Sequence, residues 1–257
     1  KESALSENTA WVMNKLLQTA MTAGTGTSYK LSGIQCFGKT GTTTDDKDRW
    51  FMGGTPDFVA GVWYGYDQPK EIYYGLSGNP SGTLWKTVMS AVYDKLDSDQ
   101  YKNLGLNRAT MSKRQPGSTI KPLSVYGPAL EKSLQDENTD IYWSTMIKDA
   151  PLKVVDGKPW PTNQGGGYSG STVTLQYGLA QSKNTISART LDMISDAGAV
   201  DYSLDFISNR FHISTLDSVK DCDYAPMATG GVTNGVTVLE MTAAYATFGN
   251  GGYYYEP

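Results

Sequence analysis

The sequence predicts an α/β (α+β) fold in which an antiparallel sheet flanked by helices joins a mostly helical subdomain. Two runs rich in aromatic residues and valine, 50–54 and 58–66, are separated by the turn Thr55-Pro56-Asp57, which indicates paired antiparallel strands. Beyond residue 107, apolar residues recur mainly at helical spacing. We therefore expect a single domain at 1–257, made of a sheet-bearing part at 1–96, a join at 97–106 and a mostly helical part at 107–257.

The elements of the first part each have a local basis in the sequence. A helix is expected at 6–21, with Ser6 as its N-cap and apolar residues repeating along one face. A strand is expected at 31–42, and a short one at 71–75. Helical periodicity returns at 83–96.

In the second part, a helix is expected to begin near Ser118, directly after a Pro-Gly pair. Another is expected at 171–181, capped by Ser171 or Thr172, and the segment 157–170 before it is expected to be a Pro/Gly-rich loop. Further helices are expected at 186–196, 201–210 and 238–248, of which the last begins with the capping-box pair Thr237 and Glu240.

Composition excludes several functional classes. An apolar fraction of 39% is typical of a folded globular protein, and a net charge of −4 without a basic stripe argues against nucleic acid as a partner. No apolar run is long enough to span a membrane. The only histidine, His212, has no motif around it, so a Ser-His-Asp triad is not expected. The sequence does not decide whether Cys36 and Cys222 form a disulfide, because pairing cannot be read from sequence.

The segment Ser118-Thr-Ile-Lys121 is a candidate nucleophile motif. Residues three apart share a helix face, so Lys121 would lie within reach of the Ser118 hydroxyl proton. A serine becomes a good nucleophile when a neighbour takes that proton, and a lysine can do so when burial or nearby positive charge lowers its pKa. Taken alone, the motif is weak, since a solvated helix face has the same spacing.

Two further short motifs could line the same cleft. In Ser182-Lys183-Asn184, a hydroxyl and a carboxamide stand two residues apart on a turn between helices. In Lys39-Thr40-Gly41-Thr42, at the end of a strand, Lys39 would supply positive charge, Gly41 would allow close approach of a ligand backbone, and the two threonines would supply hydroxyls. Each motif alone also fits an ordinary loop or strand end.

Together, the three motifs resemble the signature of the penicillin-recognising serine enzymes. The flanking residues resemble the transpeptidase domain of class A penicillin-binding proteins. The similar segments are Asn107-Arg-Ala-Thr110, Arg114-Gln-Pro-Gly-Ser-Thr-Ile-Lys-Pro122, Gly165-Gly-Gly-Tyr-Ser-Gly170, the stretch from Gly235 to Gly252, and Lys39-Thr-Gly-Thr-Thr43 followed by Asp48-Arg-Trp-Phe51.

The resemblance implies a peptidoglycan D,D-transpeptidase that needs no metal or organic cofactor. Ser118 would form an acyl-enzyme from a stem peptide ending in D-Ala-D-Ala, and a β-lactam would acylate the same residue. The family's roles would make Lys121 the base, with Ser182, Lys39 and Asn184 assisting. The backbone N–H groups of Ser118 and Thr42 would form the oxyanion hole, while Thr40, Gly41 and Thr42 would bind substrate. The chain itself is expected to be soluble, and its parent to be membrane-anchored and to act outside the cytoplasmic membrane, in the periplasm or cell wall.

The sequence departs from the family in the order of its motifs. Lys-Thr-Gly comes last in the family and first here, which predicts a circular permutation with the join at 97–106. The join is too short for the two strands that the family has there, so we expect a reduced sheet. Three alternatives stay open: a serine β-lactamase, a D-Ala-D-Ala carboxypeptidase, and an inactive scaffold or sensor that binds β-lactams.

Overall fold

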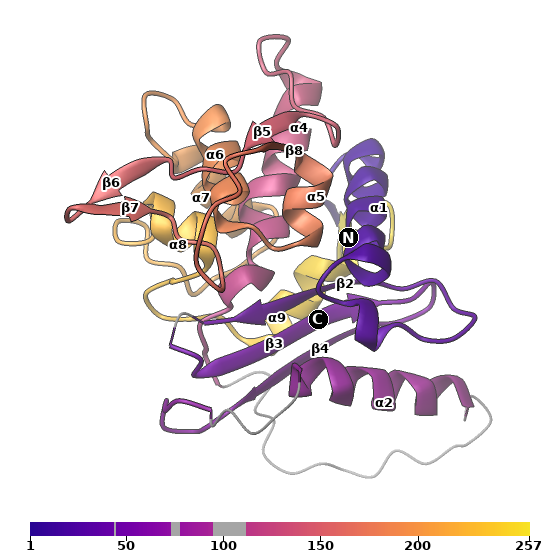
Figure 1. The fold of residues 1–257 in the computed structure, drawn as a ribbon. Coiled ribbons are helices and arrows are strands. Elements are labelled where there is room, and N and C mark those ends of the chain that lie inside the picture. The colour runs from indigo at the N-terminus through magenta and orange to yellow at the C-terminus, as the bar shows by residue number, and fades with distance from the viewer. Residues whose placement is uncertain (44, 73–77, 95–111) are drawn as a thin grey trace.

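A computed structural model describes residues 1–43, 45–72, 78–94 and 112–257. A three-stranded antiparallel sheet, in the order β2–β3–β4, lies between helix α2 and the rest of the molecule (Figure 1). The strands are β2 (Phe37–Thr42), β3 (Asp48–Gly54) and β4 (Val59–Gly65). Helix α2 (Pro80–Asp94) covers one face of this sheet, and α1 (Glu7–Ala23) and α9 (Val238–Ala246) cover the other.

Alternation along β3 explains why both faces of the sheet are covered. Successive side chains of a strand point to opposite faces. Trp50 and Met52 are fully buried in the large core shared with the helical part. Phe51 lies in the smaller core, where its ring is 5.1 Å from that of Trp85 on α2. Burial of large apolar side chains on both sides stabilises the strand that supports β2.

The helical part packs around the chain that follows Ser118. It contains α4 (Gly127–Gln135), α5 (Leu175–Ala180), α6 (Asn184–Ile194), α7 (Asp201–Asn209) and α8 (Tyr224–Thr229). It also contains two small antiparallel pairs, β5 (Met146–Lys148) with β8 (Thr172–Thr174) and β6 (Lys153–Val155) with β7 (Lys158–Trp160). None of the helices in the described residues is long and apolar enough to cross a membrane.

The two ends of the chain lie side by side. Strand β1 (Glu2–Ser3) pairs antiparallel with β9 (Tyr253–Tyr254), and the N–H groups of Ala4 and Leu5 both donate to the Gly252 carbonyl. His212 lies at the same place, where it hydrogen-bonds Glu2 at 3.1 Å and its ring lies 4.4 Å from that of Tyr254. The histidine thus contacts residues from both ends of the chain.

Most of the expected elements are confirmed. Ser6 caps α1, the turn between β3 and β4 spans 55–58 and includes the expected residues 55–57, and Thr237 and Glu240 form the capping box of α9. The expected strand at 71–75 lies mostly outside the described residues, and the join at 97–106 lies wholly outside them. Cys36 and Cys222 are free thiols.

Three expectations about element boundaries were wrong. Strand β2 begins only at Phe37, because the chain turns at Gly33 (φ +73°). The segment expected to begin a helix at Ser171 is instead strand β8, and Thr174 caps the short helix α5 that follows. The β-branched residues Thr172, Val173 and Thr174 favour pairing with β5. The loop expected at 157–170 begins with strand β7.

Candidate active site

Strand β2 carries Lys39 into the interior. The Lys39 side chain is fully buried, and its Nζ donates to Ser182 Oγ at 2.7 Å and to the Thr40 carbonyl at 3.0 Å. The Thr43 N–H bonds to the Asp48 carbonyl of β3. Because antiparallel pairing alternates, the N–H of Thr42 then points away from β3, toward the outer edge of the strand.

The Ser-x-x-Lys segment lies against that edge. A 3-10 turn spans Gly117–Thr119, a π-helical segment spans Pro122–Tyr126, and α4 continues from it. Pro122 has no N–H to donate, which accounts for the irregular hydrogen bonding here. Gly117 has φ +53°, and a Cβ there would lie 2.6 Å from the Thr42 oxygen, so only glycine permits this approach to β2.

Two aromatic side chains hold the nucleophile turn in place. The indole N–H of Trp50 on β3 donates to the Gln115 carbonyl at 2.7 Å, and the Tyr245 hydroxyl on α9 donates to the Thr119 carbonyl at 2.7 Å. Both rings are fully buried. The position of Ser118 is therefore fixed by elements from both ends of the sequence.

The Ser-x-Asn motif forms the turn between α5 and α6. The N–H of Ser182 bonds to the Leu179 carbonyl and that of Lys183 to the Gly178 carbonyl, which is the Schellman pattern of a helix end. Ser182 has φ +56°, a left-handed conformation that glycine usually adopts. This conformation costs a serine some backbone strain, and strained residues tend to occur at functional sites. The strain therefore favours a functional role for the Ser182 hydroxyl.

The amine of Lys121 links the motifs. Lys121 is fully buried, and its Nζ donates to the Ser182 carbonyl at 2.9 Å and to Asn184 Oδ1 at 2.6 Å. A neutral lysine amine has two N–H bonds and one lone pair. With both N–H groups used by these acceptors, the lone pair is available to accept a proton.

Burial sets the charge state of the two lysines. It lowers the pKa of Lys39 to about 7. The pKa of Lys121 is lowered well below its ordinary value, first by burial and then by the positive charge of Lys39. Because like charges in a buried site oppose each other, the pair favours a state in which Lys39 holds a proton and Lys121 is neutral.

Ser118 itself is only partly buried. Within the described ranges, its hydroxyl has no hydrogen-bond partner, whereas Ser182 and both lysines have partners. Lys39, Lys121, Ser182 and Asn184 are thus joined directly by hydrogen bonds, and the nucleophile turn and the Thr42 edge meet beside them, as the sequence predicts. Ser118 and Lys121 are three residues apart, so a single turn of the chain separates the Ser118 hydroxyl from the Lys121 amine.

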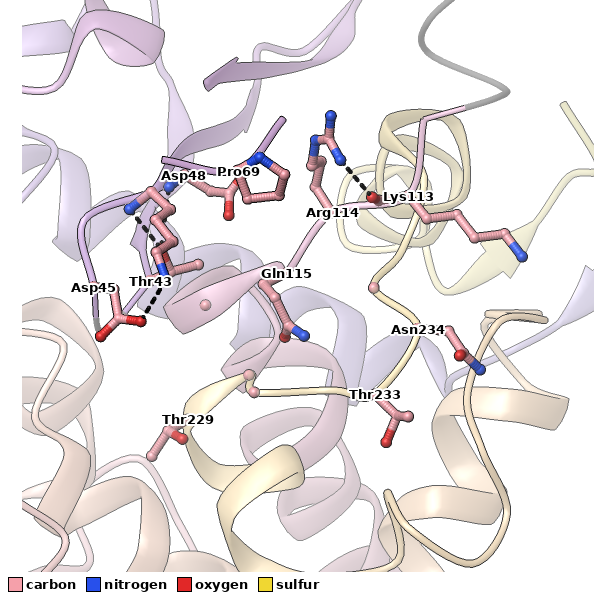
Figure 2. Close-up of a pocket in the computed structure, with 15 residues that line it drawn as sticks. Thr43, Asp45, Asp48, Pro69, Lys113, Arg114, Gln115, Thr229, Thr233 and Asn234 are labelled. Atoms are coloured by element: carbon pink, nitrogen blue, oxygen red, sulfur yellow. Dashed lines mark hydrogen bonds and ion pairs between the residues drawn. The ribbon is translucent and has the colours of Figure 1, made fainter. Parts of the chain in front are cut away.

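A cavity of about 410 Å³ adjoins this site (Figure 2). Thr43, next to Thr42, and Gly117, next to Ser118, contribute to its wall, and the loop 229–235 forms another side. In Figure 2, Gln115 lies between the nucleophile segment and that loop, and its amide donates to the Val232 carbonyl. None of the site residues predicted from sequence lines this cavity, so it lies beside the catalytic cluster.

The sequence analysis missed three contributors to the site. Thr25 Oγ1 lies 2.7 Å from Thr40 Oγ1, and the Thr162 carbonyl accepts from Asn184 Nδ2 at 2.7 Å. The fully buried Asp149 contacts both neighbours of Asn184. No spacing rule connects these residues to the motifs, because the fold brings them together from distant segments.

Comparison with known proteins shows the family of the chain. The family model described as "Penicillin binding protein transpeptidase domain" matches residues 86–257, which is well over half of the chain. The chain belongs to this family. The match includes the Ser-x-x-Lys and Ser-x-Asn motifs and leaves Lys39–Thr42 outside it. The membership predicted from the motifs is thereby confirmed, whereas the circular permutation stays a prediction.

Individual relatives are bacterial penicillin-binding proteins. Penicillin-binding protein 4 of Bacillus subtilis is 39% identical over 155 residues, which are 60% of this chain and 22% of the relative. Penicillin-binding protein 1A of Neisseria lactamica is 40% identical over 152 residues, 57% of this chain and 17% of the relative. The aligned region is therefore about a fifth of these relatives' length. A crystal structure of penicillin-binding protein 1A from Haemophilus influenzae aligns over 99% of this chain and 43% of that chain, with 20% identity and a TM-score of 0.47.

Proposed function

We propose that the chain is a serine-type D,D-transpeptidase acting on peptidoglycan stem peptides that end in D-Ala-D-Ala. The observation that carries the proposal is the buried amine of Lys121, whose two N–H groups bond to Ser182 and Asn184. A lysine held neutral one turn from a free serine hydroxyl is the base that this chemistry needs. Family membership supports the same reaction.

Acylation would begin at Ser118. Lys121 takes the Ser118 proton as Oγ attacks the carbonyl carbon between the two D-alanines, and the carbonyl π electrons move to its oxygen. The N–H groups of Ser118 and Thr42 face that oxyanion from the turn and the strand edge, a type of stabilisation that is worth several kcal/mol, about 3–4 by mutagenesis elsewhere. Asn184 holds Lys121 and binds the substrate amide.

Release of the terminal D-alanine needs a proton on its nitrogen. Ser182 Oγ accepts from Lys39 Nζ at 2.7 Å, which leaves the hydroxyl proton of Ser182 free for donation to the leaving amine. Lys121, whose Nζ bonds to the Ser182 carbonyl at 2.9 Å, would then return the proton that it took from Ser118 to the Ser182 hydroxyl. The positive charge of Lys39, with the hydroxyls of Thr40 and Thr42 and close approach at Gly41, would hold the terminal carboxylate. An amine of a second stem peptide then attacks the Ser118 ester, and its proton returns through Lys121.

The partners and location follow from this substrate. Stem peptides would serve as donor and acceptor, and β-lactams would acylate Ser118 in place of D-Ala-D-Ala. The activity would take place where peptidoglycan is assembled, at the outer face of the cytoplasmic membrane, with the parent protein anchored there.

A donor peptide ending in D-Ala-D-Ala, mixed with an amine acceptor, tests the reaction type. We expect release of D-alanine together with a cross-linked product whose yield rises with acceptor concentration. Hydrolysed donor without cross-linked product would favour a carboxypeptidase. No D-alanine release from folded protein would contradict the proposal.

The buried lysines predict a bell-shaped pH dependence of acylation by benzylpenicillin. The second-order rate constant should rise as Lys121 loses its proton and fall above a pH of about 7, where Lys39 loses its own. When benzylpenicillin is bound, its carboxylate lies beside Lys39 and raises the pKa of that lysine. The first-order rate constant for acylation within the complex should therefore fall only at higher pH. A rate constant that climbs steadily to pH 10 would contradict these charge assignments.

We also propose that the motif order arises from a circular permutation. The pairing of β1 with β9 supports this proposal, because it places Lys1 and Pro257 at adjacent strand ends. A reordered chain, with 107–257 placed before 1–96 and a short Gly/Ser linker between Pro257 and Lys1, should fold and acylate within a few-fold of the parent. A reordered chain that folds but does not acylate would contradict the proposal.

A further inference from the structure

Asp149 lies directly behind the Ser-x-Asn turn. It follows strand β5 and is fully buried. Its Oδ1 accepts from Thr185 Oγ1 at 2.6 Å and from Asn163 Nδ2 at 2.8 Å. Its Oδ2 accepts from Ser169 Oγ at 2.9 Å, from Ser169 N at 3.2 Å and from Lys183 Nζ at 3.1 Å. Both carboxylate oxygens are therefore fully engaged.

These contacts reach both neighbours of Asn184. Lys183 precedes it and Thr185 follows it, so the carboxylate holds the backbone on either side of the functional carboxamide. The carboxamide itself bonds to Lys121 through Oδ1 at 2.6 Å and to the Thr162 carbonyl through Nδ2 at 2.7 Å. Thr162 adjoins Asn163, another partner of Asp149, so the carboxylate also holds the segment that accepts from the Asn184 Nδ2 group.

The charge on Asp149 is maintained despite burial. Burial alone would raise its pKa, but hydrogen bonds from Thr185, Asn163, Ser169 and Lys183 lower it well below the ordinary value. A buried, fully bonded charge contributes little net stability compared with an apolar replacement, but it defines one geometry for every group that donates to it. The donors here come from the loop that holds Asn163 and Ser169 and from the turn that holds Lys183 and Thr185.

We propose that Asp149 is a positioning residue for acylation, which sets the orientation of Asn184 and, through it, of the Lys121 amine. The proposal rests on the function proposed above. It also gives the middle residue of the Ser-x-Asn motif a role, because Lys183 provides the cation that fixes the turn to Asp149.

The test compares Asp149→Asn with a matched control, Glu131→Gln. Glu131 is also a buried, hydrogen-bonded carboxylate, but its partners Ser6 and Gln135 lie away from the site. Both variants are titrated with a fluorescent penicillin below their melting temperatures, and the acylation rate constant and the final labelling stoichiometry are recorded separately. We expect Asp149→Asn to lose at least 10-fold in rate constant with a stoichiometry near one, and Glu131→Gln to keep the parent rate.

A merely structural role would give the opposite pattern for Asp149→Asn. The stoichiometry would fall with the folded fraction, while the surviving molecules would react at the parent rate, and that result would overturn the proposal. If Asp149→Asn does not fold, Lys183→Met leaves the other donors in place and should slow acylation several-fold at full stoichiometry. Parent rates in Lys183→Met would equally overturn it. If the unsubstituted chain takes no label, that result contradicts the proposed function, and the positioning role of Asp149 is contradicted together with it.

Discussion

Ser118→Ala is expected to abolish covalent labelling by benzylpenicillin while leaving the melting temperature unchanged to within about 1 °C. The side chain supplies the attacking oxygen, so no acyl-enzyme can form without it. Its hydroxyl is only partly buried and has no hydrogen-bond partner in the part of the chain that the structure describes, so its removal leaves no buried donor unsatisfied. Intact-mass spectrometry and thermal unfolding measure the two quantities.

Ser124→Ala provides the matched control for this variant. Ser124 lies in the π-helical segment that follows the nucleophile turn, is fully buried, and donates to the Met227 carbonyl at 2.6 Å. Its loss should cost about 1 kcal/mol of folding free energy and leave labelling intact. Covalent labelling of Ser118→Ala would show that another residue is the nucleophile.

Lys121→Met is expected to lose acylation by at least about 10³-fold and to gain stability. The rate falls because the base is removed. Stability rises because the pKa of Lys121 is lower in the folded than in the unfolded chain, so the unfolded chain binds more protons at neutral pH and protonation favours unfolding. Removing that cost should more than offset the two lost hydrogen bonds, so the melting temperature should rise by a few degrees, about 2–4 °C for each kcal/mol gained in a chain of this size.

The stabilisation by Lys121→Met has a defined pH dependence. It should be greatest at neutral pH and shrink toward pH 10, where a lysine of the unfolded chain also loses its proton. Lys132→Met serves as control, since Lys132 is bonded to the Ile194 carbonyl at the edge of the helical part, away from the site. Unchanged acylation in Lys121→Met would remove the lysine from the mechanism, and a lower melting temperature would contradict the account of its burial.

The sequence was sufficient to predict the site because its chemistry is concentrated in short motifs. Ser118 and Lys121, Ser182 and Asn184, and Lys39 lie in three segments whose spacing is visible locally. In the structure, hydrogen bonds join Lys39 to Ser182 and Lys121 to Ser182 and Asn184. The helices α1 and α9 were equally accessible, since their caps are local side-chain features.

What the sequence did not predict depends on contacts between distant residues. Strand β8 forms because Thr172–Thr174 pair with β5, a partner more than twenty residues away, whereas helical periodicity alone extended α5 over them. Asp149 is separated from Thr185 by 36 positions, and nothing around it marks a site. The π-helical segment after Lys121 likewise follows from packing around Pro122.

The central claim is that three separated motifs form one working acylation site on Ser118. The most direct test is incubation of the purified chain with benzylpenicillin, followed by intact mass over hours and peptide mapping. The account predicts a stable adduct of one equivalent on Ser118. An adduct lost within minutes would indicate a β-lactamase, and folded protein without any adduct would contradict the claim that the site is active.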